Sequence, residues 1–493
     1  MKRQQISTMM LLMGAKESFT QENAFETLQT KGLEAVKEKD MEGALIYFKQ
    51  ALLQNPHAVS VHNNLSNIYT TLGNSEAALT HLYEALRLQP QHAESYNNLG
   101  RLLYKQARIP EAIPYFEKAL RIDPNYWEAH YNLAHSLSSL NQLNRAAAHY
   151  QEVIRIMPEH PIAHFNVGLI YVAEENYALA QTHLNKAIEQ DPKNVEAFRQ
   201  LGQVYVQLGR SEEAMEIYQK ALALSPTLGD VHHNLAILYL RQSDRAKALI
   251  HFTEALKQDP TNDTAKHMVM ALSNAESNSA PATYITQLFD QYADYYDEHL
   301  KTKLKYNAPG LLRNAVGRCL PNNPTVGRVL DLGCGTGLCG IYFRDMALDL
   351  IGVDLSPKMI EKARALGAYE KLVVADFNDY LTQPDLEAFQ LVIACDVLVY
   401  TGDLETLFKN VNRVLLPGGH FVFTTEILDS TDIDSSEKNT SRYHLQPTGR
   451  FAHTPAYIHE LAKRNQLSVL CEENIILREQ EGSAIRGQIW VLG

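Results

Sequence analysis

The residues best suited to chemistry in this 493-residue chain stand in one glycine-rich segment, VLDLGCGTGLCG at residues 329–340. An apolar run leads into Gly333, Gly335 and Gly337, and a helical pattern follows. Glycines at such a crossover let the backbone turn sharply and let a ligand approach without Cβ clashes. Nineteen residues after Gly335, Asp354 ends a second apolar run, where a carboxylate can accept both ribose hydroxyls. The pattern predicts a nucleoside-containing cofactor, although its GxGxxG spacing also fits a dinucleotide.

The elements that must position this segment follow from the pattern after Tyr284. Strand-like and helix-like stretches alternate there, which is typical of a parallel sheet covered on both faces. The expected strands are residues 328–332, 348–353, 371–374, 391–394, 419–424, 468–477 and 488–492. A turn region at 480–483 predicts that the last two form an antiparallel pair at one sheet edge. The small, polar segment ESNSAPA at 276–282 predicts a linker before this domain.

The N-terminal half has a constant 34-residue period. Seven prolines mark it: Pro56, Pro90, Pro124, Pro158, Pro192, Pro226 and Pro260. In each unit an alanine lies 12 residues before the proline, and a mostly small residue lies 24 before it. A large apolar residue lies 8 before the proline, and we expect it to fill the space between neighbouring helix pairs. The period predicts a stacked array of helix pairs, ending in a solvent-facing cap at residues 261–274.

These seven units resemble the tetratricopeptide repeat, whose first helices line a concave groove. Asparagine recurs on the first helix of five units: Asn64, Asn98, Asn132, Asn166 and Asn234. This ladder resembles that of the O-linked N-acetylglucosamine transferases, which implies that the amides hold a peptide backbone by donating and accepting hydrogen bonds. The alternative is that these side chains bond adjacent helices and bind nothing.

The second half resembles the class I S-adenosylmethionine-dependent methyltransferases. The resemblance rests on the DxGxGxG pattern from Asp331, VADF at 374–377, IACDV at 393–397 and LLPGG at 415–419. It implies a Rossmann-like, seven-stranded α/β domain with an antiparallel last strand, following the α-solenoid of the repeats. The cofactor-binding residues that it implies are Asp331, Gly333, Cys334, Gly335, Gly337, Asp354, Leu355, Asp376, Phe377 and Tyr292. In this assignment Asp354 holds the ribose of S-adenosylmethionine, and Asp376 with Phe377 contacts its adenine.

Three further segments resemble the predicted methyltransferases that carry tetratricopeptide repeats. They are residues 288–309, 396–403 and 449–457. The first resembles lid helices, which implies that Tyr292 and either Tyr295 or Tyr296 close over the cofactor. Apolar packing of an amphipathic helix is the alternative reading of these tyrosines.

Four residues are candidates to face the transferred methyl group: Asp396, Tyr400, Arg450 and His453. Methyl transfer is an in-line displacement, so the protein mainly aligns and desolvates the reactants and, where needed, deprotonates one. Asp396 follows the fourth strand and is a candidate base, or else a helix cap. Arg450 with His453, in a loop-like stretch, could fix a substrate carboxylate and take a proton, or form a solvated pair. No spacing of metal ligands is present, and none is required.

Composition limits the partners and the compartment. A net charge of −12 argues against nucleic acid or anionic membranes as partners of the whole chain. No apolar run reaches the length of a membrane-spanning helix. Five cysteines without a CxxC pair are typical of the reducing cytosol. We therefore expect a cytoplasmic protein with an extension at 1–25, repeats at 26–275, a linker at 276–283 and the α/β domain at 284–493.

The leading hypothesis is a methyltransferase that acts on a small carboxylic or carrier-bound substrate or a protein side chain. Its repeat groove would recruit a peptide or protein partner. The alternative is a scaffold whose methyltransferase-like domain binds cofactor without turnover.

Overall fold

A computed structural model describes residues 24–493, apart from 294–295, 298–299, 301–303, 305, 321–326, 429–441 and 481–482. The side chains at 291, 292, 480 and 483 also lie outside the described part. The chain divides into two compact units, Met1–Pro226 and Thr227–Gly493. Within the described ranges, no helix combines the length and the apolar character needed to cross a membrane.

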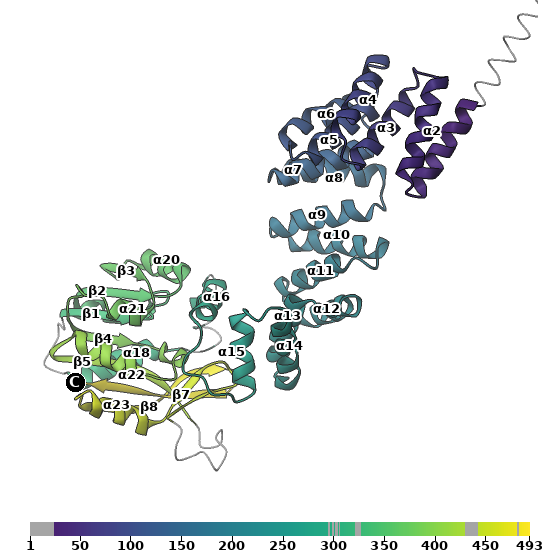
Figure 1. Ribbon diagram of the computed structural model, residues 1–493. Coiled ribbons are helices and arrows are strands. Elements are labelled where there is room, and N and C mark those ends of the chain that lie inside the picture. Colours follow the sequence, from purple (N-terminus) through teal and green to yellow (C-terminus); the bar gives the residue numbers. More distant parts are fainter. Residues whose placement is uncertain are drawn as a thin grey trace, which may run out of the picture. The chain divides into compact units, whose positions relative to one another are not determined.

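Unit 1 is a series of helix pairs that follow one another along the chain (Figure 1). A helix over residues 24–37 pairs with α2 (Met41–Gln54). The next five pairs are α3 (Val59–Thr71) with α4 (Ser75–Leu88), α5 (Ala93–Lys105) with α6 (Ile109–Ile122), α7 (Trp127–Ser139) with α8 (Leu143–Ile156), α9 (Pro161–Ala173) with α10 (Tyr177–Gln190), and α11 (Val195–Gln207) with α12 (Ser211–Leu224). These pairs confirm the predicted helical solenoid.

The recurring small and large residues make the core of each repeat. All seven alanines that lie 12 residues before a proline are 0% exposed, and the large residues four positions later are at most 1% exposed. Each large side chain packs on the small residue of its own repeat where that residue is glycine: a Cβ added to Gly32 would lie 2.7 Å from the Phe48 ring. Phe48 and Phe116 also share core clusters with the first helix of the next repeat, so these side chains pack within a pair as well as between neighbouring pairs.

Unit 2 begins with the last repeat and continues into the α/β domain. The repeat consists of α13 (Gly229–Arg241) and α14 (Arg245–Gln258), followed by the capping helix α15 (Asp263–Leu272). The cap does not face solvent as expected. Ala271 packs with Leu445 and Phe451 of the α/β domain, and α15 lies beside β7 (Figure 1).

The sheet of unit 2 has the predicted parallel core and reversed edge. Its strands are β1 (Gly327–Leu332), β2 (Ala347–Asp354), β3 (Lys371–Val374), β4 (Phe389–Ala394), β5 (Leu415–Ile427), β6 (Tyr443–Leu445), β7 (Phe451–His453), β8 (Val469–Gln480) and β9 (Ser483–Leu492). Strands β3-β2-β1-β4-β5 are parallel neighbours. Strand β9 runs antiparallel to β5, and β8 runs antiparallel to β9. This is the class I methyltransferase arrangement that the resemblance implied.

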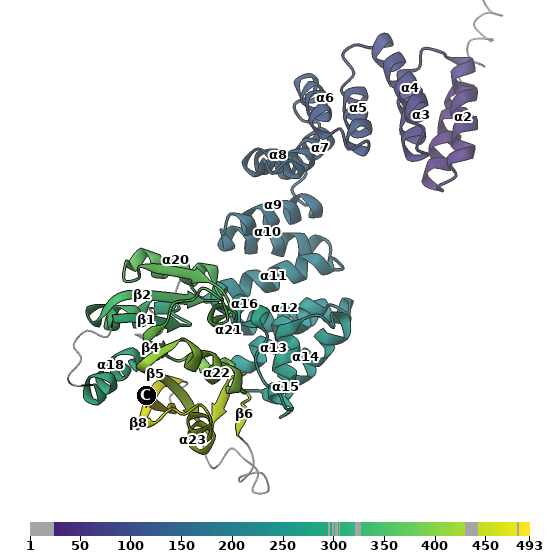
Figure 2. The same cartoon turned by 60° about the vertical axis from the view of Figure 1, so that its left-hand side comes forward.

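Different helices cover the two faces of this sheet (Figure 2). Neighbouring strand residues point to opposite faces: in β4, Val392 joins one core cluster and Ile393 the other. The first cluster includes α21 (Phe377–Leu381), α22 (Glu405–Val414) and α23 (Pro455–Arg464). The second includes α18 (Ala308–Cys319) and α19 (Leu338–Phe343). Helices α16 (Ala282–Tyr292) and α20 (Pro357–Leu366) complete the described set.

The short hairpin of β6 and β7 was not predicted. Strand β7 pairs with the end of β5, at Glu426 and Ile427. Since β9 already occupies one edge of β5 as far as Glu426, β7 must lie on the other edge, which β4 leaves free after Ala394. The hairpin therefore extends the sheet beyond the carboxyl end of β4, where α/β folds of this kind place their ligands.

Candidate functional site

A cavity of about 330 Å³ opens at the carboxyl ends of the central strands of unit 2. The residues at its wall that sequence analysis singled out are Gly333, Gly335, Asp354, Leu355, Asp376, Phe377, Asp396 and Tyr400. They come from the last residue of β2 and from the segments that follow β1, β2, β3 and β4. Segments distant in the sequence thus meet because parallel strands end at one edge of a sheet.

The glycine segment forms an open cradle. Gly333 and Gly335 have φ values of 67° and 54°, in the left-handed region that favours glycine. A Cβ added to Gly335 would meet nothing within 4 Å, so this backbone faces open space. The N–H groups of Gly333 and Cys334 both donate to the carbonyl oxygen of Val353, at 2.8 and 3.1 Å. The loop is therefore tied to the end of β2, where Asp354 stands.

Asp354 faces the cavity with its carboxylate held by backbone donors. Its Oδ2 accepts from the N–H of Gly335 at 2.9 Å, and its Oδ1 accepts from the N–H of Ser356 at 2.8 Å. Burial raises the pKa of Asp354, while these two backbone hydrogen bonds favour the ionised form and lower it. Each oxygen keeps a second lone pair for hydroxyl donors.

Three residues of the predicted cofactor set do not line the cavity. Asp331 is 1% exposed and accepts a hydrogen bond from the Tyr369 hydroxyl at 2.7 Å, and burial raises its pKa to about 7. The same hydroxyl accepts from the N–H of Gly340 at 3.0 Å. Cys334 is buried as well, and Gly337 caps α19. These residues shape the loop from beneath, and Tyr369 is a partner that no local sequence pattern indicated.

On the far wall, Asp376 and Phe377 stand at the start of α21. The Asp376 carboxylate accepts from the N–H of Asn378 at 2.8 Å and so caps the helix. Phe377 lines the cavity beside it. One oxygen of this carboxylate, Oδ1, therefore accepts from the backbone at the start of the helix.

The segment predicted to form a lid, 288–309, begins within α16. The Ser356 hydroxyl donates to Asp290, and the Thr336 hydroxyl donates to Asp297 at 2.6 Å, so the first part of this segment is tied to the loops that follow β2 and β1. Tyr296 lines the cavity. The side chain of Tyr292, and all of Tyr295, lie outside the described residues.

Asp396 belongs to a buried ion cluster that sequence analysis did not predict. Both of its carboxylate oxygens lie 3.0 Å from Nη1 of Arg478, whose Nη2 contacts Glu426. Arg478 and Glu426 are each 2% exposed. Burial raises the pKa of Asp396 to about 6 and that of Glu426 to about 7, and in both cases Arg450 opposes the shift. Asp396 also has a left-handed φ of 55°, a strained conformation found preferentially at functional sites.

Arg450 connects this cluster to the cavity wall. Its guanidinium interacts electrostatically with Tyr400, which lines the cavity. Its Nη1 lies 3.7 Å from Oε1 of Glu426 and has no hydrogen-bond acceptor among the described residues. This nitrogen is buried and is one residue contact behind the cavity wall, which Tyr400 forms.

His453 does not share this position. It is 1% exposed, and its Nε2 lies 2.9 Å from the carbonyl oxygen of Thr401 and 3.1 Å from that of Gly402. Burial lowers the pKa of His453 to about 4, so the ring is neutral near pH 7. It braces the segment after Tyr400 and does not line the cavity, in contrast to the expected arginine–histidine pair.

The segment predicted as a linker packs against this same region. Ala280 N–H donates to the carbonyl oxygen of Tyr400 at 2.9 Å, and Gly402 N–H donates to that of Asn278 at 2.8 Å. Residues 279–282 also line the cavity. Sequence analysis missed this role because small polar residues near a proline are typical of loops of any kind.

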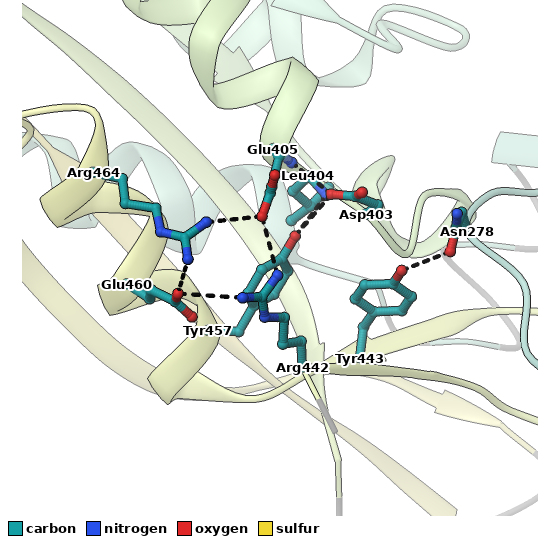
Figure 3. A network of polar contacts seen from close by, with 9 residues as sticks. All are labelled: Asn278, Asp403, Leu404, Glu405, Arg442, Tyr443, Tyr457, Glu460 and Arg464. Atoms are coloured by element: carbon teal, nitrogen blue, oxygen red, sulfur yellow. Dashed lines mark hydrogen bonds and ion pairs between the residues drawn. The ribbon is translucent and has the colours of Figure 1, made fainter. Parts of the chain in front are cut away.

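A polar network contacts Asn278 of the predicted linker and Asp403, which follows the Tyr400 segment (Figure 3). Tyr443 donates to Oδ1 of Asn278 at 2.7 Å, and Tyr457 donates to Oδ1 of Asp403 at 3.1 Å. Ion pairs surround them, joining Arg442 and Arg464 to Glu405 and Glu460. These pairs are exposed and contribute little stability each, so their effect is to hold orientation.

The asparagine ladder of unit 1 mostly joins neighbouring first helices. Asn98 Nδ2 donates to Oδ1 of Asn63 at 3.4 Å, and Asn132 Nδ2 donates to Oδ1 of Asn97 at 2.8 Å. Burial raises the pKa of the Tyr131 phenol on the preceding first helix, and Asn166 lies near enough to oppose this larger effect by lowering it. Asn64 is half-buried, and no hydrogen bond of its amide occurs among the described residues. Asn234 also has a partner.

Comparison with known proteins identifies both units. A family model described as a methyltransferase domain matches residues 330–423. Four tetratricopeptide-repeat models match residues 57–125, 103–165, 168–228 and 229–262.

Curated relatives of this chain include several methyltransferases. Malonyl-[acyl-carrier protein] O-methyltransferase of Salmonella typhimurium is 30% identical over 141 residues, which are 29% of this chain and 53% of the relative. Methyltransferase-like protein 27 of Homo sapiens is 41% identical over 85 residues, 17% of this chain and 34% of the relative. The chain thus spans about half, or less, of the length of these relatives. Among solved structures, YrrB, titled a TPR protein with an unusual peptide-binding site, has a TM-score of 0.36 and 23% identity over 38% of this chain and 96% of its own.

Proposed function

Since the chain is a tetratricopeptide-repeat protein with a class I methyltransferase domain, we propose that it methylates a carboxylate, free or on a carrier, and that the repeats recruit the partner. The observation that carries the proposal is the Arg450 guanidinium, which lies next to the cavity-lining Tyr400 and whose buried Nη1 has no hydrogen-bond acceptor among the described residues. Arginine binds a carboxylate through paired N–H donors.

The cavity supports S-adenosylmethionine as the cofactor. The open backbone at Gly335 admits a ligand that a Cβ would obstruct, and the second lone pairs of Asp354 suit ribose hydroxyls. Phe377 offers a flat apolar face to a purine. When bound, the cofactor supplies an activated methyl group on a sulfonium. The protein residues must then hold the acceptor in line with it and exclude water.

The groups around the acceptor end of the cavity favour a nucleophile that needs no base. Asp396 is paired with Arg478 through both oxygens, and His453 is turned onto backbone carbonyls. Burial raises the pKa of Tyr400 and Tyr296, so neither phenol ionises near pH 7. A carboxylate already carries the electron pair that attacks the methyl group. Its alignment by Arg450 is then sufficient.

The relatives support the same class of acceptor. The Salmonella relative is named for a malonyl group on a carrier protein. A carrier-bound acid would also give the repeats a purpose, because a protein carrier can be held by the array while its acid enters the cavity. We further propose a cytosolic location, since all five cysteines are free thiols.

The test supplies methyl-labelled S-adenosylmethionine to the full chain with malonate, malonyl carrier protein and acid-free control peptides. A methyl ester releases its label as volatile methanol in mild alkali, whereas methyl groups on nitrogen do not. We expect alkali-labile label on the acids, and a decrease of about 100-fold for Arg450→Ala from losing a charge-assisted contact. Label that resists alkali would overturn the proposed acceptor. Cofactor binding without transfer to any acceptor would favour the scaffold alternative.

The groove is tested separately with a matched pair of variants. Asn64→Ala removes an amide without a protein partner, whereas Asn132→Ala also breaks the bond to Asn97. If the groove holds a peptide backbone, Asn64→Ala weakens partner recovery without changing thermal stability. Equal recovery by Asn64→Ala and the unmodified chain would contradict the ladder as the binding element.

A further inference from the structure

The tip of the β6–β7 hairpin rests on the capping helix of the repeats. His267 on α15 is 1% exposed, and its Nε2 lies 2.9 Å from the carbonyl oxygen of Gly449. A carbonyl can only accept, so Nε2 must carry the proton. Burial lowers the pKa of His267, and its Nδ1 has no partner among the described residues. The ring is therefore a neutral donor to one backbone carbonyl.

The hairpin is shaped to allow this approach. Gly449 has a φ of 78°, and a Cβ there would lie 3.1 Å from both the Met268 sulfur and the Tyr284 hydroxyl. Leu445 and Phe451, one on each strand of the hairpin, pack against Ala271 of α15. The hairpin and the helix thus form one packed contact, with the hydrogen bond of His267 at its tip.

This hydrogen bond acts on the peptide unit that carries Arg450. The carbonyl of Gly449 and the N–H of Arg450 share one rigid plane. The turn is closed by Gln446 N–H to the carbonyl oxygen of Arg450 at 2.8 Å and by Gly449 N–H to that of Gln446 at 2.9 Å. Fixing the Gly449 carbonyl therefore fixes the direction in which the Arg450 side chain leaves the hairpin toward Tyr400 and Glu426.

The segment that follows α15 fixes the other member of the pair. Ser279 forms an isolated antiparallel bridge with Thr401, and Ala280 N–H holds the carbonyl oxygen of Tyr400. Arg450 and Tyr400 thus both depend on residues that precede the α/β domain in the chain.

We propose that the capping helix of the repeat array is a working part of the methyl-acceptor site, with His267 as the positioning residue for Arg450. The inference deepens the proposed function, because it rests on the role given there to Arg450. It also means that the acceptor site is incomplete without the last repeat, whereas the glycine cradle for the cofactor is not affected.

The test uses the full chain saturated with S-adenosylhomocysteine and titrates it with malonate in a calorimeter. His267→Phe keeps an aromatic ring but removes the donor, and His267→Gln places an amide N–H near the position of Nε2. We expect malonate to bind about tenfold more weakly to His267→Phe and within about threefold of the original affinity to His267→Gln. Affinity for S-adenosylhomocysteine should be unchanged in both. His233→Phe, at the equivalent position on α13 one 34-residue period earlier, is the matched control and should bind malonate normally.

Hydrogen exchange of residues 446–453 is measured on the same samples, so that the two proposals can fail separately. His267→Phe should increase exchange in this hairpin, and His267→Gln should restore protection. Unchanged malonate affinity and exchange in His267→Phe would overturn the positioning role, as would a His267→Gln variant that behaves like His267→Phe. If the unmodified chain and Arg450→Ala bind malonate equally, the carboxylate proposal fails, and exchange alone decides whether His267 fixes the hairpin.

Discussion

Histidine pairs inside the repeats make the array sensitive to acid. Four repeats join a histidine of the first helix to one of the second: His62 with His81, His130 with His149, His164 with His183, and His232 with His251. The Nδ1 atoms lie 2.9–3.1 Å apart in all four pairs. The third repeat has Tyr96 and Tyr115 at the same two positions. The chain therefore contains its own non-titrating version of the pair.

Comparison with the tyrosine repeat indicates which histidine nitrogens carry protons. The Tyr96 hydroxyl donates to the carbonyl oxygen of Pro90 at 3.3 Å, and Nε2 of His62 lies 3.2 Å from the carbonyl oxygen of Pro56. Since the carbonyl accepts, Nε2 of His62 carries a proton, and its Nδ1 accepts from Nδ1–H of His81. A second proton on His62 would place two N–H groups against each other and break the pair.

The second histidine of a pair titrates abnormally. Burial, and then the charge of the first histidine, lowers the pKa of His81 and of His149 to about 4. The charge of Lys49 lowers the pKa of His81 further. The charge of Arg145 lowers the pKa of His149, and Glu152 raises it. The folded pKa lies below the unfolded value of about 6.5. The unfolded chain thus takes up protons first, and stability is full above pH 6.5 and is lost as the pH falls toward 4.

We expect each of these pairs to lower the free energy of unfolding by about 1 kcal/mol between pH 7 and pH 4.5, after discounting for the partial exposure of the rings. Carboxylates also titrate in this range, so the comparison is with a variant that carries the tyrosine pair at His62, His81, His130 and His149. Urea unfolding of the full chain, followed by circular dichroism, should show the variant losing about 2 kcal/mol less than the unmodified chain. Equal losses in the two proteins would refute the reasoning.

Three further predictions concern single sites. Asp354→Ala removes the acceptor of the Gly335 N–H. It should weaken the binding of S-adenosylhomocysteine about 100-fold, measured by calorimetry, and leave the unfolding midpoint nearly unchanged. Arg478→Met should lower the free energy of unfolding by about 3–5 kcal/mol in urea, because the Asp396 carboxylate loses its buried cation; an unchanged midpoint would contradict the ion cluster. Ala107→Gly should raise that free energy by about 0.5–1 kcal/mol, since residue 107 has a left-handed φ of 59°, and a lower value would contradict the assigned turn.

The repeats could be predicted from the sequence because each one obeys the same local rule. A 34-residue period, alanines that are fully buried and a large residue four positions later define every helix pair without reference to the rest of the chain. What the sequence did not show is where the last helix packs. The cap was expected in solvent, but Ala271 meets Leu445 across more than 170 residues, and no periodic pattern encodes that contact.

The candidate site likewise contains residues that could be predicted from the sequence and residues that could not. Gly335 and Asp354 could be assigned because they follow strands whose order the class of fold determines. Glu426 and Arg478 could not, since they meet only because β9 pairs with both β5 and β8. The β6–β7 hairpin was missed because each strand has three residues, too few for an alternating pattern to be recognised.

The residues proposed to bind the cofactor and those proposed to bind the acceptor lie in different parts of the chain. The methyltransferase model matches residues 330–423, which include the cradle and Asp354 but neither Arg450 nor α15. The part that the family model matches therefore includes the residues proposed to hold the methyl donor. Arg450, its hairpin and His267 lie outside the match, so the acceptor must be inferred from this chain's own contacts. Those contacts join Arg450 to the end of the repeat array, which is the arrangement expected if the proposed acceptor arrives attached to a protein that the repeats bind.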